Sequence, residues 1–290
     1  MAPAQQEVFD QHRSYLLSLA YRMTGSRADA EDLLQEAYLR WQNAGREEIR
    51  VPMAFLTTVV TRLAITHLES ARVRREEYVG QWLPEPVVTT EARDPAELAE
   101  SLTMAFLVLL ESLTPVERAV FLLHEVFDYS HAEAAGIVGK SEEACRQILR
   151  RAKQAVEERR PRFETQPGAA ARLTAQFAEA VARGDVDGFL SLLHEEAVAY
   201  SDGGGRTRAA LNPIYGRDRV ARFLAGIVRK GGADLRRRLV EINGRPGLLG
   251  FRDGEAQTAV VLDIDGDRIR TIYIVVNPDK LQHLPKEDEE

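Results

Sequence analysis

The chain has 290 residues, of which 44% are hydrophobic and 29% are charged, and this composition excludes a disordered protein. It provides material for two or three small domains. We expect a cytoplasmic protein without membrane contact, because there is no secretory signal and no run near the ~18 apolar residues that a membrane span needs. The single cysteine, Cys145, excludes an internal disulfide and lies on an apolar helical face, so we expect no metal and no cofactor.

The formal net charge of −7 argues against a protein that holds DNA by itself. Neutralisation of phosphates dominates non-specific DNA affinity, and an acidic body opposes it. From Lys140 to Arg162, however, eight basic residues stand against four acidic ones. This balance fits a protein that touches DNA only after docking on a larger, basic assembly.

Apolar residues at three- and four-residue steps predict two helices between Glu7 and Ala44, and Ser26 is placed to cap the second. One face of that second helix carries acidic and amide side chains: Asp29, Glu31, Asp32, Gln35 and Glu36. Carboxylates near a helix N-terminus stabilise the helix, and the same face also suits docking of a basic partner. The residues alone do not separate these two interpretations.

A third helix is predicted from Pro52 to Glu77. Its polar positions combine hydroxyl and basic groups, a mixture that suits contact with a single DNA strand: Thr57, Thr58, Thr61, Arg62 and Arg72. The segment from Tyr78 to Arg93 breaks the helical pattern and is predicted to be a linker, although Trp82 and Leu83 are unusually apolar for one and require cover.

Two further helix starts are predicted, at Asp94-Pro95-Ala96-Glu97 and at Thr114-Pro115-Val116-Glu117, because each combines a cap, a proline and an acid at the third position. The second start leads into two short helices around Gly139, an arrangement typical of a helix-turn-helix. Ser130 and Ser141 are placed to cap these helices. The last helix carries a basic edge, although an ordinary helical hairpin with a solvated face remains the alternative.

Beyond a second proline-bounded linker after Pro161, the pattern changes to helices followed by strand-like runs. Asp265-Gly266 between two alternating runs predicts a hairpin. The expected strands are 197–200, 239–242, 248–251, 257–264 and 268–276, with a helix over 219–229. Helices followed by an antiparallel sheet predict an α+β cone or sandwich.

Three phrases carry a resemblance to a known family: AYRMTGSRADAEDLLQEAYLRW at 20–41, PMAFLTTVVTRLAITHLESARVRRE at 52–76, and LTPVERAVFLLHEVFDYSHAEAAGIVGKSEEACRQILRRAK at 113–153. They resemble the second and fourth conserved regions of bacterial sigma factors of the extracytoplasmic-function (ECF) group. The third domain resembles the SnoaL-like fold, and the phrases WLPEP at 82–86, DGGGR at 202–206 and NPDKL at 277–281 resemble those of a sigma subgroup with this C-terminal extension.

The resemblance implies a multidomain chain with two all-α sigma domains, the second holding the helix-turn-helix, and then a SnoaL-like cone. The boundaries expected from it are 1–77 for region 2, 78–94 for the WLPEP linker, 95–160 for region 4, 161–168 for a second linker, 169–284 for the SnoaL-like domain and 285–290 for an acidic tail.

The same resemblance implies a sigma factor that brings RNA polymerase core to promoters. Binding to the polymerase β′ clamp helices is expected from Asp29, Asp32, Leu33, Gln35 and Glu36. Contact with the −10 element is expected from Asn43, Thr57, Thr61, Arg62 and Arg72. Contact with the −35 element is expected from Ser141, Glu142, Arg146, Gln147, Arg150 and Lys153.

A regulatory interface between the C-terminal domain and the sigma domains is expected at Trp82, Leu83, Pro84, Asp202, Gly203, Gly204, Gly205, Arg206, Asn277, Pro278, Asp279 and Lys280. Asp202, Tyr200, Tyr215 and Tyr273 are the residues to examine for catalysis, because ketosteroid isomerase relatives use carboxylates and tyrosines. Fold resemblance is a weak warrant for activity, so we expect regulation and no enzyme. The alternatives are a small-molecule sensor and a polymerase-independent helix-turn-helix transcription factor with a ligand-sensing domain.

Overall fold

The computed structural model describes residues 5–44, 49–76, 78–89, 102–159, 168–232 and 234–288. The chain divides into two compact units. Unit 1 comprises Met1–Glu76 and Phe106–Arg160, and unit 2 comprises Glu77–Ala105 and Pro161–Glu290. The segment that follows the third helix, predicted as a linker, is therefore grouped with the C-terminal domain. The helix start predicted at 94–97 lies outside the described residues.

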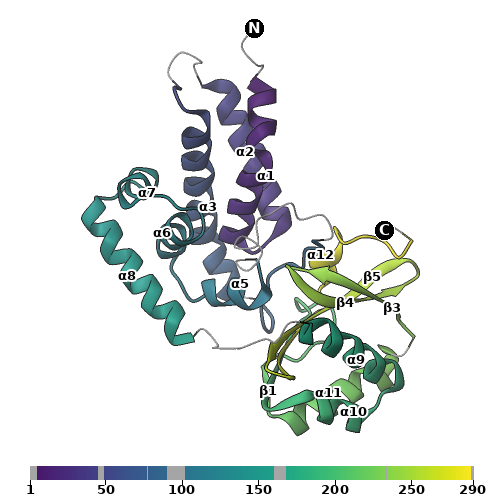
Figure 1. Ribbon diagram of the computed structural model, residues 1–290. Coiled ribbons are helices and arrows are strands. Elements are labelled where there is room, and N and C mark those ends of the chain that lie inside the picture. Colours follow the sequence, from purple (N-terminus) through teal and green to yellow (C-terminus); the bar gives the residue numbers. More distant parts are fainter. Residues whose placement is uncertain are drawn as a thin grey trace. The chain divides into compact units, whose positions relative to one another are not determined.

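Unit 1 begins with three helices that pack side by side (Figure 1). They are α1 (Gln5–Thr24), α2 (Arg27–Asn43) and α3 (Pro52–Glu76). Ser26 caps α2 as predicted, because its hydroxyl accepts a hydrogen bond from the Asp29 backbone N–H at 3.1 Å. Leu16, Leu34 and Leu56 are buried between the helices, so the apolar stripes of the three helices form one core.

The rest of unit 1 contains the predicted helix-turn-helix. Its elements are the end of α5 (Met104–Leu110), α6 (Pro115–Glu125), α7 (His131–Val138) and α8 (Glu142–Arg159). Complete capping boxes begin α6 and α7, at Thr114 with Glu117 and at Ser130 with Glu133. Gly139 ends α7 with a φ of 69°, a conformation in which a side chain would be strained, so the turn requires glycine.

Unit 2 is an α+β domain built on one sheet with the strand order β2-β1-β6-β5-β4-β3. The strands are β1 (Leu193–Asp202), β2 (Ile214–Tyr215), β3 (Arg236–Ile242), β4 (Arg245–Arg252), β5 (Glu255–Asp265) and β6 (Arg268–Val275). The prediction of a wholly antiparallel sheet is wrong, because β1 and β6 pair in parallel. The long connection between them, which carries four strands and a helix, allows this pairing.

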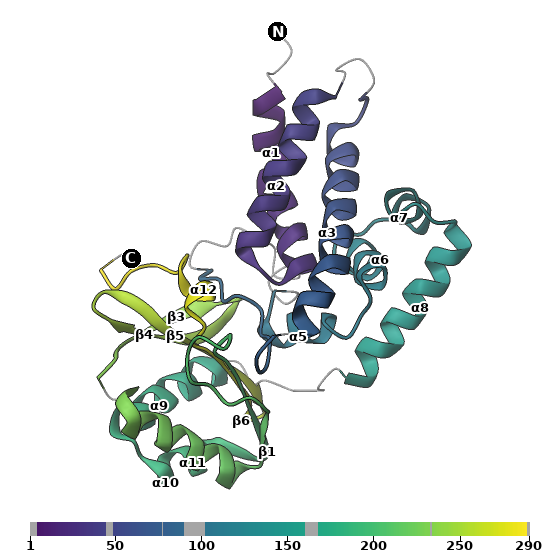
Figure 2. The same ribbon diagram turned by 180° about the vertical axis from the view of Figure 1, so that it is seen from behind.

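Helices cover one face of this sheet (Figure 2). They are α9 (Ala169–Arg183), α10 (Val186–Leu192) and α11 (Arg217–Ile227), and a short helical turn, η1 (Val228–Gly232), follows. Phe177, Phe189 and Leu224 pack from the helices against Leu262 and Ile272 of the sheet. The hairpin at Asp265-Gly266 is confirmed, whereas β2 and the short helix α12 (Pro278–Leu281) were not predicted.

The opposite face of the sheet holds a buried acid, Asp263, which accepts a hydrogen bond from the Tyr273 hydroxyl at 2.9 Å. Burial raises the pKa of Asp263 from 3.8 to about 6, although the bond from Tyr273 and the charge of Arg245 oppose the shift. Burial, together with Asp263, also raises the pKa of Tyr273. The ionised carboxylate at position 263 is therefore a cost to the folded state.

Asp263→Asn should remove a pH dependence of stability. The folded domain keeps the Asp263 proton up to about pH 6, whereas the unfolded chain releases it near 3.8. The free energy of unfolding should thus fall as pH rises through this window, by on the order of 3 kcal/mol. Compared with the parent, Asp263→Asn should gain stability between pH 4 and pH 7 in thermal or urea unfolding. Asp267→Asn, in the exposed neighbouring turn, is the control, and identical pH profiles for parent and Asp263→Asn would refute the assignment.

Candidate functional site

Helix α8 presents the basic edge predicted for −35 recognition. Ser141 caps the helix, accepting a hydrogen bond from the Ala144 N–H at 3.2 Å. The exposed side includes Glu142, Arg146, Gln147 and Arg150, and Lys153 at its border pairs with Glu125 at 2.8 Å. Cys145, Ile148 and Ala152 are buried on the other side, as is Leu149, which the prediction had not included. An exposed polar helix face held by a packed turn is the geometry with which such motifs enter a major groove.

Helix α2 presents an exposed acidic face. Asp32, Gln35 and Glu36 are exposed on it, and Glu36 forms an ion pair with Arg40 at 2.9 Å. Asp29 lies 3.3 Å from His67 of α3. Leu33 is only 7% exposed, so its inclusion among the surface contacts needs correction, since its side chain belongs to the core. Prediction had missed Leu39, which is 48% exposed one turn beyond Gln35 and adds an apolar contact to this face.

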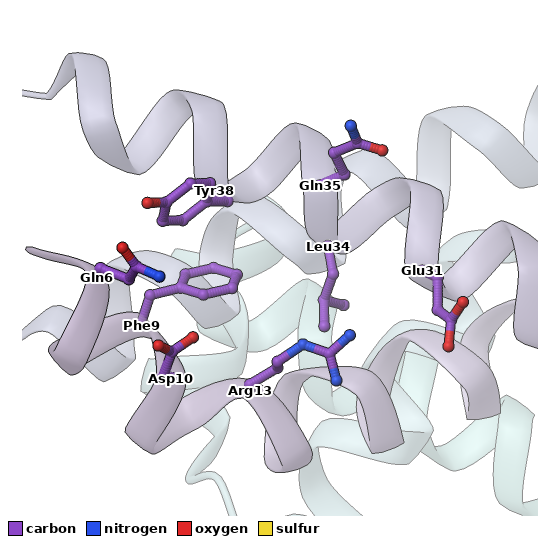
Figure 3. Close-up of a pocket in the computed structure, with 8 residues that line it drawn as sticks. All are labelled: Gln6, Phe9, Asp10, Arg13, Glu31, Leu34, Gln35 and Tyr38. Atoms are coloured by element: carbon purple, nitrogen blue, oxygen red, sulfur yellow. The ribbon is translucent and has the colours of Figure 1, made fainter.

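A hollow of about 340 Å³ lies between α1 and α2, beside this acidic face. Figure 3 shows Phe9 of α1 with Leu34 and Tyr38 of α2 along the hollow, while Arg13 and Glu31 stand at one end. The rings of Phe9 and Tyr38 meet edge to face, with centroids 4.9 Å apart. Gln6, Asp10 and Gln35 complete the lining. The hollow can take an apolar side chain of a partner whose polar flanks meet the surrounding charges.

Helix α3, predicted to read the −10 element, is covered on one side by α6 and α7. Thr57 and Thr61 are fully buried, so in this arrangement neither hydroxyl is accessible to a DNA strand, and their contact with the −10 element stays a prediction. Within the described residues the Thr61 hydroxyl has no hydrogen-bond partner. Asn43 is exposed at the end of α2, and the side chain of Arg72 lies outside the described residues.

Two sets of polar contacts hold α7 and the preceding loop against α3. The Arg62 guanidinium donates to the carbonyls of Ile137 at 2.8 Å and Gly136 at 3.1 Å, at the C-terminal end of α7. A cation at this end also complements the helix dipole. Tyr15 donates to the hydroxyl of Tyr129 at 3.1 Å, and Tyr129 donates to Thr57 at 3.1 Å. Burial and the contact with Tyr129 raise the pKa of Tyr15, so the Tyr15 hydroxyl stays protonated.

A buried arginine, Arg118, also joins α6 to the end of α1. Its side chain is 3% exposed and donates to the Met23 carbonyl at 2.7 Å. It donates as well to the Leu110 carbonyl at 2.7 Å and to the Glu111 carboxylate at 2.8 Å. Because a buried cation without such partners is costly, the guanidinium specifies how region 4 docks on α1 in unit 1.

In unit 2, the three phrases WLPEP, DGGGR and NPDKL meet around a buried ion pair, which we call the linker site. Lys280 Nζ lies 2.7 Å from Asp202 Oδ2, and their side chains are 7% and 0% exposed. Asp202 also accepts hydrogen bonds from the Tyr78 hydroxyl at 2.6 Å, the Leu83 N–H at 2.9 Å and the Gly204 N–H at 3.0 Å. Lys280 donates in addition to the Leu83 carbonyl. The two charges are therefore satisfied by each other, by Tyr78 and Leu83 of the linker and by the Gly204 N–H.

Aromatic rings enclose the ammonium group of Lys280. Its Nζ lies 4.1 Å from the centroid of the Trp82 ring and 5.2 Å from that of Tyr78. Burial, followed by the hydrogen bond to Asp202, raises the pKa of Tyr78. The apolar residues of the linker are therefore covered as predicted: the Lys280 ammonium group lies over the Trp82 ring, and Leu83 is 2% exposed.

Glycines in DGGGR allow the backbone to approach closely. A side chain at Gly204, where φ is 60°, would meet Asn277 at 2.4 Å, and one at Gly203 would meet the Thr207 carbonyl at 2.2 Å. Arg206 forms an ion pair with Asp279 at 2.9 Å. Pro84 is buried, and Pro278 begins α12, which carries Lys280. The residues predicted for a regulatory interface therefore lie together.

The linker continues as an added strand segment on β3. Thr89 donates to the Glu241 carbonyl at 3.0 Å, and Asn243 donates to that of Val87 at 2.8 Å. His283 of the C-terminal segment lies 3.0 Å from the Pro86 carbonyl. Prediction had missed these contacts, because isolated Asn and Thr residues in a sequence carry no signal of the strand that they will join.

The residues considered for catalysis do not form a reactive group. Asp202 is occupied by Lys280 and the linker backbone, and Tyr273 bonds to Asp263. Tyr200 stacks on Tyr273 with centroids 5.7 Å apart, while Tyr215 is 59% exposed. Within the described ranges, no three His, Cys, Asp or Glu side chains are grouped as a metal site requires, and no helix is long and apolar enough to cross a membrane.

Comparison with protein-family models matches residues 8–74 to Sigma-70 region 2 and residues 103–156 to Sigma-70, region 4. The ECF RNA polymerase sigma factor SigJ of Mycobacterium tuberculosis is 38% identical over 292 residues, which cover 96% of this chain and 93% of that protein. The chain belongs to the ECF RNA polymerase sigma factors. The probable sigma factor SigI of the same species is 31% identical and covers 95% of this chain and 94% of its own.

The sigma factor also matches a solved structure over its length. The crystal structure of M. tuberculosis SigJ aligns with a TM-score of 0.77 and 36% identity, covering 95% of this chain and 98% of that one. The predicted fold class is confirmed, with helical regions 2 and 4 followed by an α+β domain. Sigma factors are not enzymes. The individual site residues stay predictions, now with a geometry around them.

Lys280→Met should release the linker from the C-terminal domain. It leaves the Asp202 carboxylate buried without its cation, which costs about 3–5 kcal/mol. In a Trp41→Phe background, Trp82 is the only tryptophan, and its emission should shift to longer wavelength as the ring enters water. Adding Asp202→Asn should restore part of the stability, because the uncompensated charge is gone. Lys286→Met, which removes an exposed lysine paired with Glu255, should leave the emission unchanged; an unshifted Lys280→Met spectrum would contradict this role.

Proposed function

We propose that this sigma factor brings RNA polymerase core to promoters through α2 and reads the −35 element with α8, and that its C-terminal domain controls access to both steps. The observation that supports the proposal best is family membership over nearly the whole chain, combined with an exposed polar face on the second helix of the helix-turn-helix. Arg146 and Arg150 provide guanidinium groups suited to bidentate contact with guanine.

The polymerase contact is proposed for the acidic face of α2 and the hollow beside it. Asp32 and Glu36 supply charge for the basic side chains of a partner, and Leu39 supplies exposed apolar area. The hollow at Phe9 and Tyr38 has room for one apolar side chain of the partner. The family resemblance nominates the β′ clamp helices as that partner. Charge on this face should steer association, while the apolar contacts should provide most of the affinity.

Two measurements test the polymerase contact: DNA binding by the parent with and without core enzyme, and binding by a variant of the α2 face. The parent chain alone should bind promoter duplex weakly at physiological salt, because its net charge is −7, and should bind it specifically once core enzyme is added. The double variant Asp32→Lys and Leu39→Glu should lose most of the core-dependent binding, by roughly tenfold or more, since it removes charge and apolar contact together. Gel shifts and binding assays with core measure both effects.

Glu179→Lys is the matched control, because this glutamate is 69% exposed on α9. It should leave core affinity unchanged. If the parent bound promoter duplex tightly and specifically without core, the alternative of a polymerase-independent transcription factor would replace the sigma mechanism.

Regulation is proposed to begin within unit 1. With α6 and α7 packed on α3, Thr57, Thr61 and Arg62 cannot reach an opened strand, so this arrangement is closed toward the −10 element. Promoter opening then requires region 4 to leave α3. The cost of leaving includes the bonds of Arg62, Tyr129 and Arg118, which polymerase binding must offset.

The C-terminal domain is proposed to act by holding the linker between regions 2 and 4. At the linker site, residues 78–89 are bonded to Asp202, Lys280 and β3, which limits how far the linker can extend. Sensing of a small molecule is less well supported. The cavity between α9, α11 and the sheet, lined by Phe177 and Leu248, has about 70 Å³, against about 300 Å³ or more for typical ligand pockets.

Tyr129→Phe should favour the open arrangement of unit 1. It removes the hydroxyl between Tyr15 and Thr57 and leaves the buried Thr57 hydroxyl and the partly buried Tyr15 hydroxyl with one partner fewer each, at a cost of about 1–3 kcal/mol. Transcription with limiting sigma factor should therefore increase several-fold in a reconstituted assay. Tyr215→Phe, at a 59% exposed position of the C-terminal domain, should behave like the parent. An unchanged or lower output, with the overall stability of Tyr129→Phe intact, would show that region 4 docking does not limit initiation.

A further inference from the structure

One corner of the C-terminal sheet concentrates positive charge in an acidic protein. From Arg229 to Arg252 the chain has seven basic and two acidic residues, whereas the whole chain carries −7. Arg229 and Lys230 are exposed in η1, and Arg236 is exposed at the start of β3. We call these residues, together with Arg238 and Arg252, the arginine corner.

Backbone and register contacts bring these residues together. Arg252 at the end of β4 donates to the Gly231 carbonyl of η1 at 2.9 Å. Arg236 pairs across β3 and β4 with Phe251, the neighbour of Arg252, so Arg236 and Arg252 lie at the same end of the sheet edge but on opposite faces of it. Arg238 lies two residues along β3, on the same face as Arg236, with its guanidinium 5.1 Å from the Phe251 ring centroid. Alternate residues of a strand are about 6.6 Å apart, so Arg236 and Arg238 form a pair on one face, while Arg252 and η1 add basic groups at the other face of the same edge.

An acidic residue near the C-terminus, Glu287, lies on this corner. Arg236 Nη1 lies 2.9 Å from Glu287 Oε1, and Arg238 Nη1 donates to the Glu287 carbonyl at 3.1 Å. The Glu287 N–H donates to the Gly254 carbonyl at 3.0 Å. Residues 286–290, KEDEE, hold four acids and one lysine. Glu287 of this chain thus occupies two of the five basic side chains.

We infer that the arginine corner binds the phosphate backbone of duplex DNA and that the acidic tail competes with DNA for it. The planar guanidinium fork matches phosphate oxygens, and a cluster of basic side chains from three adjacent elements is the electrostatic footprint of a nucleic-acid surface. The ion pair between Arg236 and Glu287 is weak and exchangeable, because the Arg236 side chain is 79% exposed to solvent. Contacts with phosphates carry no sequence information, so this binding adds affinity to any duplex without adding sequence specificity.

Fluorescence anisotropy of the full-length chain with a labelled duplex that lacks promoter elements tests this inference. The double variant Glu287→Gln and Asp288→Asn should bind several-fold more tightly than the parent, because the competitor is weakened. Arg236→Gln with Arg252→Gln should bind more weakly, by roughly threefold for each arginine. Each lost phosphate contact should also lower the slope of log affinity against log salt by about 0.9.

Arg268→Gln is the matched control. It removes an exposed arginine paired with Asp267 at the opposite end of the same sheet, where β5 turns into β6, and should change neither affinity nor slope. The tail variant keeps the test decisive even if the arginine variant unfolds, because surface amides on the tail do not disturb the core. Equal affinities and equal salt slopes for all variants would overturn the proposal. So would binding of a free KEDEE peptide to the corner with no response to duplex, which would assign the surface to an acidic protein partner.

Discussion

The buried ion pair between Asp202 and Lys280 is the interaction on which the organisation of unit 2 depends. Two opposite charges that are nearly inaccessible to water are stable only if their remaining bonding capacity is filled. Here the linker fills it, with the Leu83 N–H and carbonyl and the Tyr78 hydroxyl. The domain therefore cannot release residues 78–89 without exposing or orphaning a charge. The segment 78–89, which connects regions 2 and 4 in the sequence, is therefore held in the C-terminal domain by the need to pair these two buried charges.

In unit 1, arginine side chains hold the helices together. Arg62 and Arg118 donate to backbone carbonyls of helix ends, where the chain itself lacks donors. These bonds attach the helix-turn-helix module to the α3 and α1 helices and bury Thr57 and Thr61 at the contact. The proposed function assigns the same threonines to the −10 element, so under it one surface has two mutually exclusive occupants. Such competition would couple polymerase docking to promoter opening without any ligand.

Elements with a local signal could be predicted from the sequence, and those specified by distant contacts could not. Caps at Ser26, Thr114 and Ser130 and the hairpin at Asp265-Gly266 follow from neighbouring residues, and all are present. Parallel pairing of β1 with β6 joins segments about seventy residues apart, and no local pattern encodes it. The phrases around Trp82, Asp202 and Lys280 were grouped in advance only through family resemblance. The burial of Thr57 was not predicted, because the helical period assigns Thr57 to a face of α3 but does not show that α6 and α7 cover this face.

Charge distribution provides the final constraint. The protein is acidic overall, yet α8 and the arginine corner carry basic side chains. On each of these two surfaces, at least one basic side chain is paired with an acid of the same chain. Lys153 is paired with Glu125, and Arg236 with Glu287. Hydrogen bonds from Lys153 and His124 outweigh burial and lower the pKa of Glu125, so that acid stays charged. Internal anions that occupy cationic surfaces lower the affinity for stray DNA while leaving contacts that a stronger polyanion can replace. A sigma factor needs this balance, because it must ignore most of the genome until polymerase adds the remaining binding energy.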